Sequence, residues 1–347
     1  MGQAQRRLIQ PGGPVEFPGL AGPPFHPPDR LKGRVIMAQL PAPPTLTLAA
    51  IWAHYEANQE TGFREHLGAS LIGAECTRQI WYSWRWTTKA RHSGRLLRLF
   101  ATGNLAEARF IADLRAAGVE VLDIDPETGK QWQVRDESGH FGGSMDAVCV
   151  GLPEAPKTWH CCEFKTHNTK SFVELANKGV QQAKPQHFAQ MQVYMHLTGM
   201  ERAVYLAVNK NDDDLYLERV HYDAAFALRL VAKAHAIIAS PQPPERISAD
   251  PAWFQCRFCD HAAQCHTGKL PEAHCRSCLH STPTDGGQWV CEAEGKHLTV
   301  EDQMRGCPRH LYIPGLVHGE QVDADRDGLS ITYAMPDGTR WTDGIPF

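Results

Sequence analysis

The order of helical and strand-like segments limits most strongly what this 347-residue chain can fold into. A helix-period pattern of apolar residues runs from Arg95 to Ala117, and Gly118 ends it. Four strand-like segments follow, over residues 119–124, 131–135, 141–150 and 158–165. A helical segment over residues 185–198, two strand-like segments over 202–209 and 215–221, and a helical segment over 224–239 come next. This order predicts an α/β core built on a mixed sheet.

The segments outside this core differ in composition. Residues 1–45 are rich in Pro and Gly without periodicity, so we expect them to be disordered. We expect the main domain over residues 46–270, with helices near 46–60 and 74–84, and a small module with a hairpin near 331–341 over residues 271–347. Because no apolar run reaches the length of a membrane span or resembles a secretory leader, we expect a cytoplasmic protein without a membrane partner.

A local basic segment contrasts with the formal net charge of −4, which by itself gives no indication of nucleic acid. No carboxylate occurs from Thr77 to Ala106, where basic side chains alternate with aromatic ones. Such a segment is either a surface that pairs with phosphates and stacks on bases, or a basic helix whose aromatic residues belong to the core. The candidates for contact with nucleic acid are Arg78, Trp81, Tyr82, Arg85 and Lys89.

Three short stretches predict one metal site. They are Gly143-Ser-Met-Asp146, Glu163-Phe-Lys165 and Gln190-x3-Tyr194. Residues two apart in a strand share a face, so the Glu163 and Lys165 side chains lie together, and a neighbouring antiparallel strand can bring the Asp146 carboxylate beside them. Two carboxylates hold a hard divalent cation, and a lysine beside them can hold a water molecule.

These residues, in this order, resemble the PD-(D/E)XK nuclease superfamily over about residues 62–266, and within it the RecB-like branch that includes CRISPR-adaptation nucleases. The resemblance implies a restriction-endonuclease-like core, a mixed central sheet flanked by helices. It also implies that Asp146, Glu163 and the Phe164 carbonyl bind Mg²⁺ or Mn²⁺, that Glu107 adds a ligand, and that Lys165 positions or deprotonates the attacking water.

The resemblance also places the helix that carries Gln190 and Tyr194 against the active site. We assign these two side chains, and His187 three residues before Gln190, to substrate or phosphate contacts. The alternative makes Asp146 a turn residue and Glu163–Lys165 an exposed ion pair on a strand.

Eleven cysteines include two sets with the spacing of metal ligands. Cys256, Cys259 and Cys265 follow the last core helix, and Cys76 lies far upstream. Four thiolates suit an iron–sulfur cluster or tetrahedral zinc. The resemblance to iron–sulfur members of the RecB-like branch favours a [4Fe–4S] cluster, with His261 and His266 as substitute ligands.

The second set is Cys275, Cys278, Cys291 and Cys307, which predicts a structural zinc site in the C-terminal module. His280, His297 and His310 are alternative ligands. Such a tail either binds DNA or a partner protein, or is a passive stabilising cap.

The resemblance therefore implies a metal-dependent deoxyribonuclease, an exonuclease acting on single-stranded or duplex DNA ends in recombination, repair, phage recombination or CRISPR adaptation. A recombination or annealing protein is the partner class that fits this role. Two alternatives stay open: a catalytically silent nucleic-acid-binding adaptor, and a restriction-type endonuclease.

Overall fold

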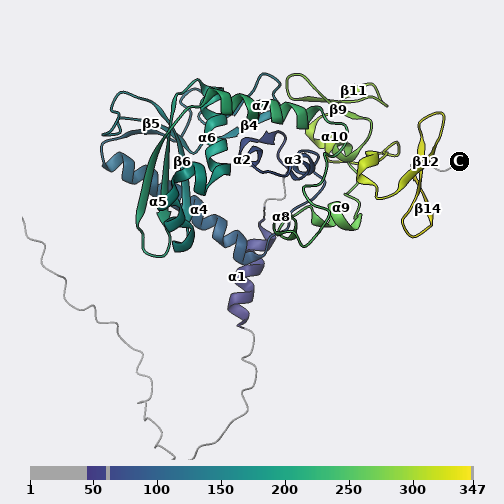
Figure 1. The fold of residues 1–347 in the computed structure, drawn as a ribbon, viewed down its shortest axis with the longest axis horizontal. Coiled ribbons are helices and arrows are strands. Elements are labelled where there is room, and N and C mark those ends of the chain that lie inside the picture. Colours follow the sequence, from purple (N-terminus) through teal and green to yellow (C-terminus); the bar gives the residue numbers. More distant parts are fainter. Residues whose placement is uncertain (1–44, 60–62, 345–347) are drawn as a thin grey trace, which may run out of the picture. The chain divides into compact units, whose positions relative to one another are not determined.

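A computed structural model of the chain describes residues 45–59 and 63–344 (Figure 1). The chain divides into two units, residues 1–45 and 46–347, and every element below belongs to the second. The disorder predicted for residues 1–45 falls, except for Thr45, outside the described residues. Within the described residues, no helix combines the length and apolar character needed to cross a membrane.

The core is built on a five-stranded sheet, in which β6 and β7 are parallel and the other neighbouring pairs are antiparallel. Its strands in spatial order are β2 (Glu120–Leu122), β5 (Ala147–Val150), β6 (His160–His167), β7 (Arg202–Asn209) and β8 (Leu215–His221). The predicted mixed sheet is confirmed.

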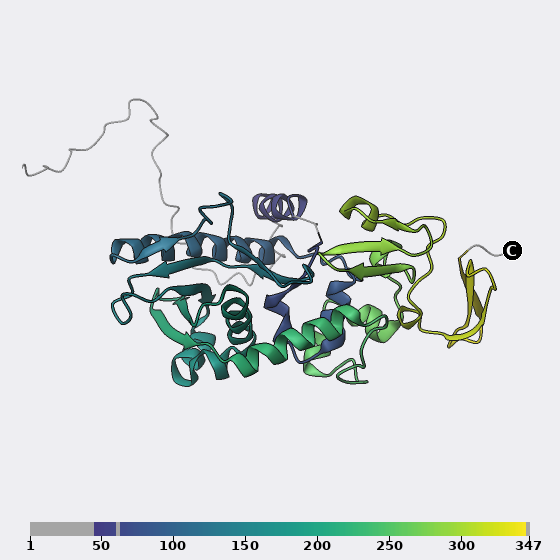
Figure 2. The ribbon, with the colours of Figure 1, turned by 90° about the horizontal axis from the view of Figure 1, so that it is seen from above.

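Helices cover both faces of this sheet (Figure 2). On one face, α4 (Gly94–Ala116) packs Phe110 and Leu114 against apolar side chains of the strands. The other face carries the apolar side chains of α6 (Pro185–Thr198), flanked by α5 (Thr169–Ala183) and α7 (Ala224–Ala239). The α/β class predicted from the order of the segments is confirmed.

The segment predicted as one strand over residues 141–150 forms two strands in different sheets. β4 (Phe141–Ser144) lies between β1 (Leu67–Gly68) and β3 (Gln133–Arg135), whereas β5 pairs with β2 and β6. The chain changes sheets at Met145 and Asp146. Because Asp146 lies in neither strand, its carboxylate is able to reach the backbone of β6.

Helix α5 was not predicted from the sequence. Its start is capped by Asn168, whose side chain accepts a hydrogen bond from the Ser171 amide at 2.9 Å. Gly179 interrupts the helix with φ of 73°, a conformation that favours glycine. The kink divides the apolar pattern into two short pieces, which explains why no continuous helical period is visible.

Short helices complete the amino-terminal half: α1 (Leu46–Ala57), α2 (Ala69–Ile72) and α3 (Thr77–Trp84). The C-terminal part carries two three-stranded antiparallel sheets, and the predicted hairpin is confirmed as β13 and β14. Its elements are α8 (Phe254–Arg257), α9 (Ala262–Thr267), η1 (Cys275–Ser277), β9 (Ser281–Thr284), β10 (Gln288–Cys291), β11 (Lys296–His297), α10 (Val300–Gln303), η2 (Pro314–Leu316), β12 (Glu320–Ala324), β13 (Ser330–Ala334) and β14 (Arg340–Gly344).

The C-terminal part contributes Trp289, Leu298 and Ile313 to the main hydrophobic core, and Arg276 packs against its tryptophans. Its buried guanidinium lies 4.6, 4.2 and 3.9 Å from the ring centroids of Trp84, Trp86 and Trp289. It donates hydrogen bonds to Gln303 Oε1 at 2.7 Å and to the Glu65 carbonyl at 2.8 Å. Rings and acceptors together replace the water that a buried cation loses. Arg276 therefore joins the tail to α3 and the segment that follows it.

Candidate active site

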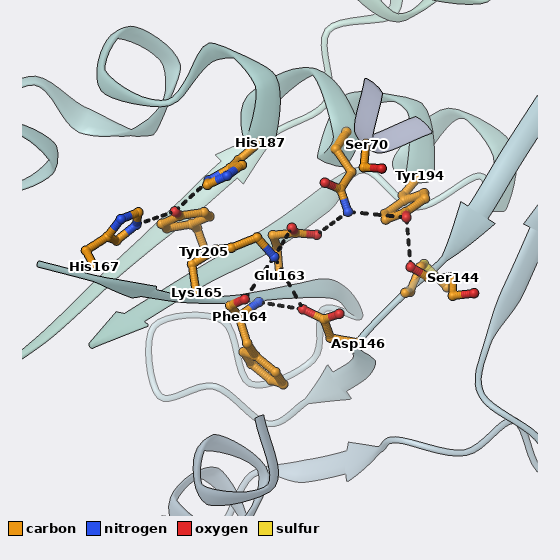
Figure 3. A network of polar contacts seen from close by, with 12 residues as sticks. Ser70, Ser144, Asp146, Glu163, Phe164, Lys165, His167, His187, Tyr194 and Tyr205 are labelled. Carbon is orange, nitrogen blue, oxygen red and sulfur yellow. Dashed lines mark hydrogen bonds and ion pairs between the residues drawn. The ribbon is translucent and has the colours of Figure 1, made fainter. Parts of the chain in front are cut away.

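Asp146 and Glu163 lie side by side on adjoining segments, as the sequence predicts (Figure 3). β5 and β6 are antiparallel with Ala147 opposite Cys162, so the residue before β5 lies beside the middle of β6. Asp146 Oδ2 accepts a hydrogen bond from the Phe164 amide at 2.7 Å. The alternative prediction, with Asp146 as a turn residue and Glu163–Lys165 as an exposed ion pair, does not fit, because the Glu163 side chain is fully buried.

The Lys165 ammonium lies among the oxygens expected to bind a metal. Its Nζ is 2.5 Å from Glu163 Oε1, 2.9 Å from the Phe164 carbonyl oxygen and 4.0 Å from Asp146 Oδ2. Among the described residues, Glu163 Oε1 has no hydrogen-bond donor of good geometry, although the ammonium is in contact with it. The ammonium stands in for the charge of a cation, and the oxygens around it fit a hard divalent ion.

Burial and repulsion between like charges govern the acids of the site. Burial raises the pKa of Glu163 to about 7; Lys165 opposes this shift, and Asp146 and Glu107 add to it. Burial also raises the pKa of Asp146, and that of Glu107 on α4, where Asp146 adds to the effect. Glu107 therefore lies within electrostatic reach of the other two acids. Three acids near one lysine make a site that favours added positive charge.

Gln190 and Tyr194 on α6 hold Glu163 in place. Gln190 Nε2 donates to Glu163 Oε2 at 2.9 Å and to the Tyr194 hydroxyl at 3.3 Å, and that hydroxyl donates to the Ser144 carbonyl at 2.7 Å. A Cβ on Gly143 would lie 2.6 Å from the Tyr194 hydroxyl oxygen, so this glycine permits the close approach. Both side chains are buried and position the carboxylate. Their predicted contacts with substrate remain a prediction.

A second polar chain, absent from the sequence prediction apart from His187, adjoins Lys165. The Tyr205 hydroxyl is 2.9 Å from His167 Nε2 and 2.8 Å from His187 Nδ1. Burial and, to a lesser extent, the charge of Lys165 together lower the pKa of His187 to about 3. His187 is therefore a neutral hydrogen-bonding group near pH 7. His167 follows Lys165 by two residues on the same face of β6, a spacing that could have identified it.

The predicted nucleic-acid-binding segment is largely buried. Trp81, Tyr82 and Arg85 keep 0, 1 and 4% of their surface exposed, so the prediction that they contact DNA is wrong for this structure. Trp81 Nε1 donates to the Ser240 carbonyl, and Arg85 packs over the rings of Trp81 and Trp289. These three side chains fit the alternative prediction, in which the aromatic residues of the segment belong to the core. Of the remaining candidates, Arg78 is half-buried and Lys89 exposed.

The first cysteine set gathers around one hollow, lined by Cys76, Cys256, Cys259 and Cys265. Burial raises the pKa of Cys256 and Cys259, and the other two thiols add to both shifts. Of the substitute ligands, His261 has both ring nitrogens occupied, by Ser83 Oγ at 2.9 Å and Thr88 Oγ1 at 2.8 Å, while His266 lines the hollow.

The four thiols of the second cysteine set also lie near one another. Burial, together with the nearby thiols of Cys278, Cys291 and Cys307, raises the pKa of Cys275 to about 12. Of the alternative ligands, His310 is bonded to Ser277 Oγ at 3.1 Å. In residues 45–59 and 63–344, no three His, Cys, Asp or Glu side chains are close enough together to hold a metal ion as they stand. This finding covers both cysteine sets and also Glu107, Asp146 and Glu163.

No family model and no curated protein matches this chain. Among solved structures, it is similar to LHK-Exo in complex with dAMP, at 18% identity over 55% of this chain and 91% of that chain with a TM-score of 0.38. It is also similar to the alkaline exonuclease LHK-Exo from Laribacter hongkongensis, at 17% identity over 54% and 91% with a TM-score of 0.37. A phage-related exonuclease from Haemophilus somnus 129PT is 13% identical over 39% and 66%, with a TM-score of 0.29. At such identities and TM-scores a likeness does not decide function, so we base the functional proposal on the side chains of the site.

Proposed function

We propose that this chain is a metal-dependent deoxyribonuclease of the PD-(D/E)XK superfamily, an exonuclease that processes DNA ends. The observation that carries the proposal is the contact of one ammonium with two of the oxygens expected to bind metal, Glu163 Oε1 and the Phe164 carbonyl, with Asp146 Oδ2 4.0 Å away. A buried pair of carboxylates costs free energy unless positive charge is supplied. A divalent cation supplies that charge.

The donor set suits Mg²⁺ or Mn²⁺, held by Asp146, Glu163 and the Phe164 carbonyl, with Glu107 as a further acid nearby. When bound, such an ion polarises the scissile phosphate and stabilises the negative charge that develops on it. Gln190 holds Glu163 in orientation through its 2.9 Å hydrogen bond.

Lys165 holds the attacking water in this proposal. Burial lowers its pKa, but Glu163 and Asp146 outweigh burial and raise the pKa above the usual value, so the amine is charged without metal. Its side chain keeps 29% of its surface exposed, which leaves a route for water. A charged lysine donates hydrogen bonds to a water or a phosphate oxygen without first losing a proton.

The decisive test compares the isosteric variants Glu163→Gln and Lys165→Met on end-labelled DNA with Mg²⁺ or Mn²⁺. We expect each to lower cleavage by about 100-fold or more, as loss of a preorganised charge does. The exposed turn residues Glu127 and Lys130 give matched controls, Glu127→Gln and Lys130→Met. Wild-type cleavage rates in both site variants would refute the assignment.

The shape of the DNA products decides between the remaining alternatives. Shortening from the ends with no action on closed circles supports an exonuclease, and discrete internal fragments indicate a restriction-type endonuclease. DNA binding without cleavage under either metal would make the chain a silent adaptor instead.

We also propose that Cys76, Cys256, Cys259 and Cys265 hold a [4Fe–4S] cluster, with zinc as the alternative, and that the second set holds zinc. Support for the first set comes from the hollow that its four cysteines line, and support for the second from the proximity of its thiols, which raise the pKa of Cys275. A bound metal would reverse such shifts. Anaerobic purification should give a brown protein with iron, sulfide and one zinc. A colourless protein with two zinc ions would replace the cluster by zinc.

A further inference from the structure

A hollow of about 870 Å³ lies at the start of α4, outside the metal site described above. The segment after α1, the end of α3 with the segment that follows it, and α4 itself form its walls. Figure 1 shows α1 beside this end of α4, and the two helices pack together. A space of this size matches a small-molecule site. Its walls include Phe63, Arg64, Trp86, Lys89, His92 and Phe100.

Aromatic rings form one part of the walls. Phe63 stacks on Trp86, with 4.9 Å between ring centroids and 8° between ring planes. His92 meets the Phe100 ring edge-on at 5.3 Å between centroids. Trp86 is 2% exposed and its Nε1 donates to the Arg64 carbonyl at 2.8 Å, whereas Phe100 keeps 48% of its surface exposed. Packing within the chain thus fixes Trp86 and leaves much of the Phe100 ring available to a ligand.

Positive charge forms the other part of the walls. Among the residues that the structure describes, none of the side chains lining the hollow is acidic, and Arg64 and Lys89 are both exposed. Neither forms an ion pair with a carboxylate in the described part of the chain. Glu56 of α1 accepts a hydrogen bond from the Gly94 amide at 2.7 Å instead. The hollow therefore favours a ligand that combines a flat apolar group with negative charge.

Arg64 joins the hollow to the active site. Its Nη1 donates to Ser70 Oγ at 3.3 Å, and Figure 3 shows Ser70 among the residues around Glu163. Burial raises the pKa of Tyr194, and the charge of Arg64 opposes this rise. The Tyr194 hydroxyl in turn accepts from Gln190, which holds Glu163. Because Arg64 is exposed, this route runs along the surface, and the hollow shares no lining residue with the hollow of the first cysteine set.

Together these properties select a nucleotide as the ligand. A base stacks on an aromatic ring, and a lysine or arginine pairs with a phosphate. An apolar peptide segment would leave the two cations unused, and a small inorganic anion would leave the rings unused. A base inside a duplex has both faces covered by its neighbours, so an unpaired base fits the hollow. The polymer proposed to be cut at Glu163 supplies such a base.

We propose that the hollow takes one unpaired base of the nucleic-acid strand that is cut at Glu163, with the base against Phe100 and Lys89 at an adjoining phosphate. The proposal rests on the proposed function, since that strand is the substrate of the site. It adds that the substrate has at least one base without a pairing partner near the cleaved bond.

Binding of fluorescent single strands of about ten nucleotides tests the proposal, with Ca²⁺ in place of Mg²⁺ so that binding is read without cleavage. An abasic residue at successive positions, counted from the end of the strand, removes one base at a time. Wild-type protein should have one sensitive position, where loss of the base weakens binding about tenfold. Phe100→Ala should weaken binding of the intact strand about tenfold and no longer respond to the base at that position.

Matched variants control for changes that do not involve the hollow. Phe100→Tyr keeps the ring and should keep wild-type binding. Trp159→Ala removes an aromatic side chain of similar exposure, 42%, outside the hollow, and should also behave as wild type. Lys89→Gln should lower the slope of log K against log salt by about 0.7, the value for one lost phosphate contact, whereas Lys130→Gln on an exposed turn should not.

Three results would overturn the proposal. They are a wild-type scan without a sensitive position, unchanged binding of the intact strand by Phe100→Ala, and the same sensitive position in Phe100→Ala as in wild type. Thermal stabilisation by free dCMP that needs Phe100, together with a scan without a sensitive position, would make the hollow a mononucleotide site instead. An unchanged salt slope in Lys89→Gln would overturn the role given to Lys89.

Failure of the proposed function has a different signature. Wild-type protein would then cleave no strand with Mg²⁺ or Mn²⁺, while the sensitive position and its loss in Phe100→Ala would persist. Cleavage by wild type without a sensitive position would leave the function standing and remove the base from the hollow.

Discussion

Competition between protons and metal at Glu163 gives the most specific prediction of the site. The carboxyl is fully buried, and burial raises its pKa to about 7 in the metal-free protein, with Asp146 and Glu107 adding to the effect. A metal ligand must be ionised, so protonation at Glu163 competes directly with the ion. Lowering the pH is therefore the perturbation, and apparent metal affinity is the quantity that changes.

The magnitude follows from the pKa. The apparent dissociation constant is multiplied by one plus the ratio of protonated to ionised Glu163, which is about 1.1 at pH 8, about 2 at pH 7 and about 11 at pH 6. Binding should thus weaken about tenfold from pH 8 to pH 6. A carboxyl with the ordinary value of 4.5 would change it by only a few per cent over the same range.

Titration calorimetry with Mn²⁺ at several pH values measures this dependence, and proton release during binding gives an independent reading. Heats in two buffers of different ionisation enthalpy should show about half a proton released from Glu163 at pH 7. Glu163→Gln should abolish binding, and Glu127→Gln should keep the wild-type profile. An affinity that is constant between pH 6 and pH 8 would refute the reasoning, whatever the cleavage assays show.

Further predictions concern stability. Because the folded pKa of Glu163 lies above its unfolded value, its contribution to metal-free stability is complete below pH 4.5 and is lost as the pH rises through about 7. Buried histidines such as His187, with lowered pKa values, change stability in the opposite direction, so the Glu163 contribution is measured against Glu163→Gln. In urea denaturation without metal, the wild type should lose about 3 kcal/mol relative to this variant between pH 4.5 and pH 8, and Mn²⁺ at pH 8 should restore the stability of the wild type. Arg276→Met removes the donor of two buried hydrogen bonds and one part-buried one and should cost about 3 kcal/mol or more, whereas the exposed Arg326→Met should cost less than about 0.5 kcal/mol. Trp81→Phe should lower stability by about 1 kcal/mol through the lost hydrogen bond to Ser240 and leave DNA affinity unchanged; a selective loss of DNA affinity would instead mean that Trp81 becomes exposed on binding.

The sequence predicted the geometry around Glu163 because short-range rules determine it. Alternation along β6 fixes the shared face of Glu163 and Lys165, and one antiparallel neighbour suffices to bring Asp146 beside them. One turn of α6 separates Gln190 from Tyr194 in the same way. What the sequence could not specify is that these two side chains would turn inward and hold Glu163, since this depends on how α6 packs on the sheet.

The aromatic segment shows where sequence patterns stop being informative. The sequence allowed two predictions for the segment around Arg85, an exposed surface that binds nucleic acid or a helix whose aromatic residues are buried, and both place Arg85 among tryptophans. Burial was decided by Trp289, more than 200 residues further along the chain, which lies 5.2 Å from Trp84 between ring centroids. No local pattern contains that contact, because it joins α3 to a sheet in the C-terminal part.

The contact between Trp84 and Trp289 also affects how the C-terminal part should respond to the loss of a metal ion. A small module held only by its own zinc would unfold alone when the metal is removed. Here Arg276, next to Cys275, is buried among Trp84, Trp86 and Trp289, and its guanidinium bonds the Trp84 carbonyl at 3.3 Å. If the second cysteine set holds zinc as proposed, its removal should therefore loosen the packing around α3 rather than unfold the tail alone. Helix α3 also begins directly after Cys76 of the first set, so we expect removal of metal from the second set to change the environment of that thiol as well.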